Sequence, residues 1–159
     1  MPSLPSAGLL AFRRTEGAAE VLLTRPRASG RRIWQVPGWE PDAGEEPVVA
    51  TIEERLRQPR SRKPTRAQLL TLACARFATS FGCEAAAPFL FLGGVKQHRH
   101  RILYVWATEL DCDLAAPALS GSGAVAMAHY LDLADARRLI VSSQRRFVDE
   151  LEVLLRHQR

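Results

Sequence analysis

Residues 34–47 read W-Q-V-P-G-W-E-P-D-A-G-E-E-P, a short apolar run followed by a loop rich in glycine, proline and acidic residues. The run 33–36 has the character of a strand, and the pair Pro37-Gly38 is expected to end it because both residues favour turns. The loop 37–46 then leads to Pro47, which the first turn of a helix tolerates. This segment therefore predicts a strand, a long loop and the start of a helix.

Apolar runs on both sides of this segment predict a sheet with helices. Residues 8–12 and 21–24 are short apolar runs separated by a polar stretch that contains Gly17, which is typical of a pair of strands. Further strands are expected at 89–92, 101–108 and 128–131, with a charged turn at 96–101. Helices are expected at 47–59, from Thr65 to Gly82, from Asp132 through Ile140, and from Ser142 or Ser143 with Phe147, Leu151 and Leu154 facing inward.

The helix after Thr65 has the clearest boundaries. Thr65 and Gln68 have the spacing of a capping box, in which the two side chains satisfy exposed amides of the first turn. Apolar residues such as Leu69 and Phe77 recur at helical spacing, and Gly82 follows where a left-handed helix end costs least.

Composition limits the class of protein. The chain has 159 residues, of which 47% are hydrophobic and 25% charged, as in an ordinary single globular domain. Its longest apolar runs are too short to cross a membrane, so we expect no membrane partner. The uncharged start does not resemble a secretory leader, and three cysteines without a C-x-x-C pair favour reduced thiols, so the expected location is the cytoplasm. The net charge of +5 is nearly all arginine and favours phosphate groups.

The order of these pieces resembles the Nudix (MutT-like) superfamily, most of all its branch of small NTP pyrophosphohydrolases and diadenosine tetraphosphate hydrolases. The similar motifs are Ala19-Glu20-Val21-Leu22-Leu23, the W-x-x-P of Trp34 and Pro37, Gly44-Glu45-Glu46-Pro47, and Phe89-Leu90-Phe91-Leu92-Gly93. The resemblance covers most of the chain. It implies an α/β fold, an α-β-α sandwich with a mixed β-sheet, formed by one domain over 1–159 with a basic insertion around 48–64.

The family signature G-x5-E-x7-R-E-U-x-E-E-x-G-U is degenerate in this chain. In the family, glutamates on one helix face hold magnesium against a diphosphate, since hard cations need several oxygen ligands. Here Trp39 occupies the position of the first glycine of the signature, and Gly38 occupies the position of the lysine that precedes this glycine in the family. Glu45 matches the first glutamate of the signature.

Two registers are possible beyond Glu45. Without a gap, Glu54 keeps one helix glutamate, while Arg57 and Gln58 replace the metal-binding pair. With an insertion of about two dozen residues, which surface loops tolerate, Gly82 becomes the closing glycine. Arg76, Thr79 and Ser80 then replace the glutamates. We favour this second register, and in both registers the paired carboxylates are missing.

The leading hypothesis is a divergent Nudix-fold protein that binds a nucleotide or a nucleoside-diphosphate-linked ligand, with metal-dependent pyrophosphohydrolase activity impaired or lost. A cation 4 Å from Arg76 would meet about 4 kcal/mol of repulsion at an effective dielectric constant of ~20. An arginine can instead bind a phosphate directly. Trp39 is a candidate for stacking on a base, and Arg76, Lys96, His98 and Arg101 are candidates for contacts to the ligand.

Two alternatives remain open. The first is an active pyrophosphohydrolase with catalytic Glu45 and Glu54, in which Mg²⁺ or Mn²⁺ would be held by relocated ligands, namely Glu40, Glu45, Glu53 and Glu54. The second is a protein or RNA interaction module that uses the basic residues of positions 55–66 to follow a phosphate backbone.

Overall fold

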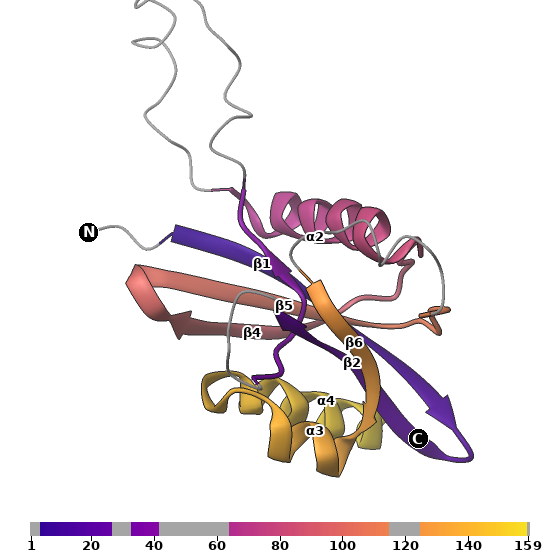
Figure 1. The fold of residues 1–159 in the computed structure, drawn as a ribbon. Coiled ribbons are helices and arrows are strands. Elements are labelled where there is room, and N and C mark those ends of the chain that lie inside the picture. Colours follow the sequence, from indigo (N-terminus) through magenta and orange to yellow (C-terminus); the bar gives the residue numbers. More distant parts are fainter. Residues whose placement is uncertain (1–3, 27–32, 42–63, 115–124, 159) are drawn as a thin grey trace, which may run out of the picture.

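The computed structural model describes residues 4–26, 33–41, 64–114 and 125–158. Within them a sheet lies between two helical layers, with α2 on one face and α3 and α4 on the other (Figure 1). This confirms the expected α/β sandwich with a mixed sheet. The described elements are β1 (Leu4–Thr15), β2 (Ala18–Pro26), β3 (Gly38–Trp39), α2 (Arg66–Phe81), β4 (Leu90–Gln97), the 3₁₀ turn η2 (His98–His100), β5 (Arg101–Glu109), β6 (Val125–Asp132), α3 (Leu133–Leu139), the 3₁₀ turn η4 (Ser142–Gln144) and α4 (Arg145–His157).

The sheet has the order β4-β5-β1-β2-β6, with β3 paired to β1 outside this path. β1 and β5 run parallel, and the other pairs are antiparallel. One edge of β1 is divided between two partners, since Ala7 and Gly8 pair with β3, whereas the stretch from Phe12 to Thr15 pairs with β2. The sheet therefore forks at β1.

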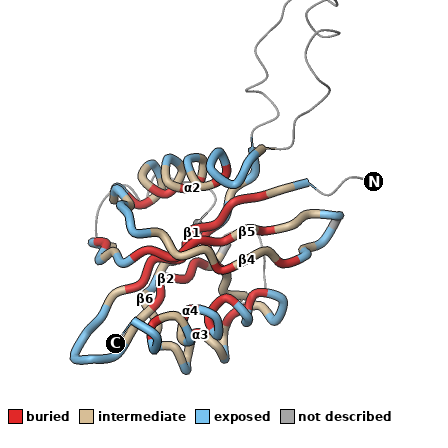
Figure 2. The backbone as a smooth tube through the Cα atoms, turned by 180° about the vertical axis from the view of Figure 1, so that it is seen from behind, coloured by how far each residue is buried: buried red, intermediate tan, exposed pale blue. Residues whose placement is uncertain are grey.

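The core consists of two apolar clusters, one on each face of the sheet (Figure 2). Successive side chains of a strand point to opposite faces, so Leu10 and Phe12 join the cluster under α4, whereas Leu9 and Ala11 join the cluster under α2. α2 contributes its buried residues Leu69, Ala73, Phe77 and Phe81, and α4 contributes Phe147, Val148, Leu151 and Leu155.

The boundaries of α2 confirm the capping prediction. The Thr65 hydroxyl accepts a hydrogen bond from the Gln68 amide at 3.2 Å, and the Gln68 side chain accepts one from the Thr65 amide at 2.9 Å. At the other end, Gly82 has φ of 67° and donates its N–H to Ala78 O. A left-handed residue at this place closes the helix at little steric cost when it is glycine.

The predicted strand at 33–36 was wrong. Trp34 and Gln35 form only isolated bridges, and the strand that joins the sheet is Gly38–Trp39. The glycine that was taken as a stop signal permits a close approach, because a Cβ on Gly38 would lie 3.1 Å from Leu103 Cδ1. Similarly, the expected charged turn at 96–101 is shorter, since β4 continues to Gln97 and only 98–100 form the 3₁₀ turn.

The start of the last helix also differs from the prediction. Ser142 and Ser143 belong to η4, and no side chain caps α4, whose N-cap position is taken by Gln144. The Gln144 side chain bonds to another part of the chain instead. Phe147 and Leu151 are buried as expected, whereas Leu154 is only partly buried.

Two expected segments, the helix at 47–59 and most of the basic insertion at 48–64, lie outside the described residues. In the part of the chain that the structure describes, no helix is long and apolar enough to cross a membrane.

Candidate functional site

A cavity of about 420 Å³ opens where the sheet forks at β1. This volume lies in the range of small-molecule sites. Its walls come from β1, the segment 35–40, α2, the β4–β5 hairpin and η4. The lining residues are Ser6, Gln35, Val36, Gly38, Trp39, Glu40, Arg76, Gln97, Arg101, Leu103 and Gln144.

Buried polar contacts fix two of these walls. Gln144 is only 2% exposed, and its Oε1 accepts a hydrogen bond of 2.8 Å from the amide of Val36. This contact joins η4 to the segment that carries Trp39. On the opposite side, the Ser6 hydroxyl donates to the Ile102 carbonyl at 3.3 Å and ties β1 to β5. The cavity is thus held by hydrogen bonds that cross between elements distant in the sequence.

The polar groups of the β4–β5 hairpin gather at one end of the cavity. Gln97 and Arg101 face each other across the ladder, and Arg101 forms an ion pair with Glu40. Within the described residues, Gln97 Nε2 and Arg101 Nε are buried without a hydrogen-bond partner. Arg76 reaches the same cavity from α2. In the described part of the lining there are therefore two permanently charged guanidinium groups and one carboxylate.

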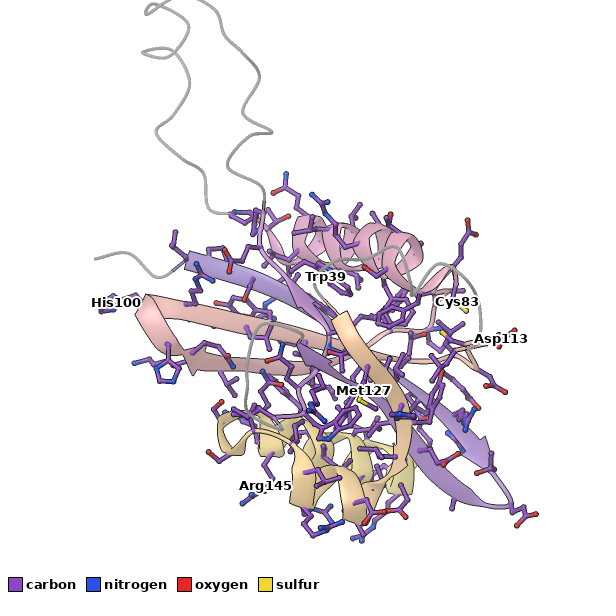
Figure 3. The ribbon with its side chains drawn as sticks, viewed as in Figure 1. Trp39, Cys83, His100, Asp113, Met127 and Arg145 are labelled. Carbon is purple, nitrogen blue, oxygen red and sulfur yellow. The ribbon has the colours of Figure 1, made fainter. Side chains whose placement is uncertain are left out.

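Trp39 provides an aromatic wall. Its ring meets the ring of Phe77 edge to face, with centroids 6.4 Å apart and an interplanar angle of 81°. Phe77 belongs to α2 and is fully buried in the core. The contact with Phe77 anchors the indole of Trp39, which is itself partly exposed. Figure 3 shows Trp39 between α2 and the sheet. Such an indole can stack on a planar ligand.

The described residues do not fit a divalent metal site. α2 (Arg66–Phe81) has no aspartate or glutamate, and Glu40, the one acidic residue among the described residues of the lining, is paired with Arg101. No three His, Cys, Asp or Glu side chains of the described ranges lie together as ligands. Mg²⁺ and Mn²⁺ prefer several oxygen ligands. Glu45, Glu53 and Glu54 lie outside the described residues.

Four of the candidates from the sequence come together in this cavity, namely Trp39, Glu40, Arg76 and Arg101. Lys96 and His98 are exposed and are not among the lining residues. The 3₁₀ turn at 98–100 interrupts the extended backbone after Gln97, so the side chains of Lys96 and His98 do not share one face as they would in a continuous strand.

Sequence reasoning missed the amide side chains of the site. Gln35, Gln97 and Gln144 line the cavity from three different elements. Single glutamines dispersed over the chain form no motif, so only the register of the sheet and the position of η4 reveal them.

Comparison with solved structures identifies the architecture. The NUDIX domain of Shewanella oneidensis NrtR, complexed with ADP ribose, superposes with a TM-score of 0.62 at 13% identity, over 98% of this chain and 90% of that chain. This protein has the Nudix fold. Two further solved structures also superpose on this chain. An Ap4A hydrolase of C. elegans has a TM-score of 0.62 at 14% identity, covering 97% of this chain and 98% of that one. The C-terminal domain of mouse MUTYH, from its complex with human PCNA, has a TM-score of 0.55 at 18% identity, covering 97% and 88%.

At the level of sequence, no family model matches this Nudix-fold chain, and no curated protein matches it either.

Proposed function

We propose that this Nudix-fold protein binds a nucleotide or a nucleoside-diphosphate-linked ligand in the forked cavity, and that its metal-dependent pyrophosphohydrolase activity is impaired or lost. The observation that carries the proposal is the charge of the site. Among the described residues that line the cavity are two arginines and one glutamate, Glu40, and the adjacent helix α2 has no carboxylate. The site thus favours an anion over a cation.

The arginines would hold the phosphate groups. A guanidinium presents planar N–H donors that match phosphate oxygens, and its charge does not titrate. At 4 Å and an effective dielectric constant of ~20, it attracts a negative charge by about 4 kcal/mol and repels a cation by as much. Arg76 and Arg101 therefore replace the metal as the electrostatic clamp on a phosphate.

The remaining lining would hold the nucleoside. Trp39 offers a ring face, and Gln35, Gln97 and Gln144 carry amides with both donors and acceptors. Base edges need this combination of stacking and paired hydrogen bonds. The volume of about 420 Å³ suits one nucleoside with its first phosphates.

The position of α2 supports the register in which Arg76, Thr79 and Ser80 replace the family glutamates. α2 lies between β3 and β4 in the chain and ends at Gly82. In this register the chain is a single domain whose insertion precedes α2.

Two of the superposed structures suggest the probes, since one holds ADP ribose and another is an Ap4A hydrolase. Calorimetric titration with each compound, in EDTA and in Mg²⁺, tests the proposal. We expect the same Kd with and without the metal, and a loss of affinity of about tenfold or more in Arg76→Gln, because one charge-assisted contact is removed. Arg146→Gln, which removes an exposed charge of α4, is the matched control.

Two outcomes would contradict this proposal. One is binding that requires Mg²⁺ or is unchanged in Arg76→Gln. The other is release of a nucleoside monophosphate from either compound in Mg²⁺, lost in Glu45→Gln, which would instead establish an active hydrolase.

A further inference from the structure

Two cysteines meet away from the cavity, at the far end of α2. Cys83 directly follows the helix cap Gly82, and Cys112 lies just beyond the end of β5. Cys112 is 3% exposed in the cluster under α2, and Cys83 is half-buried against the same cluster. The two thiols are close enough to interact, since Cys83 raises the pKa of Cys112. In Figure 3, Cys83 and Asp113, the neighbour of Cys112, lie at the same edge of the molecule.

Side-chain hydrogen bonds hold both segments in place. The Thr108 hydroxyl of β5 donates to the carbonyl of Ala86 at 2.7 Å, which fixes the connection after Cys83. The Tyr130 hydroxyl of β6 donates to the Leu110 carbonyl at 2.6 Å and accepts from the Cys112 amide at 2.9 Å. The thiols are thus neighbours because the backbone on each side is tied to the sheet.

We propose that Cys83 and Cys112 are a redox-sensitive dithiol, which small-molecule disulfides such as oxidised glutathione convert reversibly to an intramolecular disulfide. This is a modification site distinct from the nucleotide cavity, and it does not depend on the proposed function.

The exchange balances in two steps. Cys83 loses its proton to water, and its thiolate attacks one sulfur of oxidised glutathione; the glutathione S–S bond breaks, and one glutathione leaves as a thiolate that takes up a proton. Cys112 then gives its proton to water and attacks the Cys83 sulfur of the mixed disulfide; the mixed S–S bond breaks, and the second glutathione leaves as a thiolate that takes up a proton. The protein dithiol is oxidised by two electrons, and one glutathione disulfide is reduced to two thiols.

The environment sets the order of these steps. Cys83 is the more exposed sulfur, so it meets the oxidant first. Burial, and then the neighbouring Cys83 thiol, raise the pKa of Cys112 to about 12, so Cys112 is protonated before the exchange begins and is a poor first nucleophile. Once Cys83 carries glutathione, however, Cys112 is the adjacent group that can resolve it.

The bridge would close the segment 83–112, which contains the whole β4–β5 hairpin with Gln97 and Arg101. A cross-link over such a length reduces the freedom of the unfolded chain. We therefore expect the oxidised protein to unfold at a temperature higher by roughly 5 °C or more.

The test is a thiol count on the folded protein after treatment with oxidised glutathione, followed by denaturation, with non-reducing peptide mapping. Cys74, on α2, provides the matched control through Cys74→Ser. We expect one free thiol of three in the native sequence, none in Cys74→Ser, and a linked pair of peptides that contain Cys83 and Cys112. In Cys112→Ala we expect a lasting glutathione adduct on Cys83 and no thermal shift.

Three free thiols after treatment would overturn the proposal. A bridge to Cys74 would do the same, as would separate glutathione adducts on Cys83 and Cys112 in the native sequence. The thermal shift gives a second measurement, because it must appear on oxidation and disappear with dithiothreitol.

Discussion

The two helical layers bury similar apolar stripes, but only the α3–α4 layer combines basic with acidic residues. α2 contains two arginines and no acidic residue. On the other face, Arg137 of α3 pairs with Asp149 and Glu152 of α4, and Arg156 also pairs with Glu152. Packing against the sheet therefore does not determine where carboxylates occur. The carboxylates of the α3–α4 layer form ion pairs that join the two helices. The helix α2, in contrast, has no carboxylate beside the cavity.

If the layers are equivalent in packing, truncation of their central aromatic residues should have equal effects. Phe77 of α2 and Phe147 of α4 are both fully buried against the sheet. We expect Phe77→Ala and Phe147→Ala each to lower the free energy of unfolding by about 3–5 kcal/mol, through lost burial and the cavity left behind. Urea unfolding measures this, with Val153→Ala, at a 46% exposed position, as a control expected to change little. A large difference between the two phenylalanines would show that one layer contributes far more than the other.

The α4 layer has a second role, because the turn η4 directly before α4 holds a cavity wall. Gln144→Leu should lower the free energy of unfolding by about 1–3 kcal/mol, since the buried Val36 amide loses its acceptor. The same variant should also weaken nucleotide binding if η4 positions the lining. Gln158→Leu, at the exposed position that directly follows α4, is the control. Unchanged stability in Gln144→Leu would mean that water replaces the amide.

Alkaline pH should affect the α2 side selectively. Burial raises the pKa of Cys112 from 9.0 to about 12 and that of Tyr130 above its usual value. Asp111 also contributes to both shifts. A raised pKa means that the folded state favours the protonated form of each side chain. The contribution of Cys112 and Tyr130 to the free energy of unfolding is therefore complete below about pH 9, and it is lost as the pH rises toward their pKa values in the folded protein.

The free energy of unfolding should then fall above pH 9 by up to about 1.4 kcal/mol per pH unit for each group. Urea unfolding in the presence of reductant measures this slope, and Cys112→Ala should reduce it. An identical slope in the variant would contradict the assignment to Cys112.

The ion pairs of the α3–α4 layer should have the smallest effect. Arg137 and its partners are partly exposed, so solvent screens them. Arg137→Met should cost about 1 kcal/mol or less, and the difference from the native sequence should shrink at high salt. A cost that is independent of salt would indicate lost packing of the arginine stem instead.

Local signals in the sequence were enough for much of this fold. The Thr65–Gln68 pair and Gly82 predicted both ends of α2, because caps act within one helical turn. Most strands were located in the same local way, because a short apolar run bounded by turn residues is enough to indicate a buried strand. The strand predicted at 33–36 was wrong because Gly38 was taken as its end. A glycine that ends a strand cannot be told in the sequence from one that allows close pairing of strands.

The candidate site was less accessible to such reasoning. Trp39 and Arg76 could be selected through the family resemblance, but Ser6, Gln97 and Gln144 meet only after the sheet has formed. Their proximity depends on the parallel register of β1 with β5 and on the place of η4, and neither is encoded in a short window of residues.

The fork of β1 has a consequence for how this protein could have diverged. Main-chain pairing makes the opening, because β1 exchanges one partner for another between Gly8 and Phe12. Side chains on the rim can therefore be exchanged through evolution while the path of the backbone is preserved. The superposed structures show the same separation of backbone and side chains, because they keep this fold at only 13–18% identity.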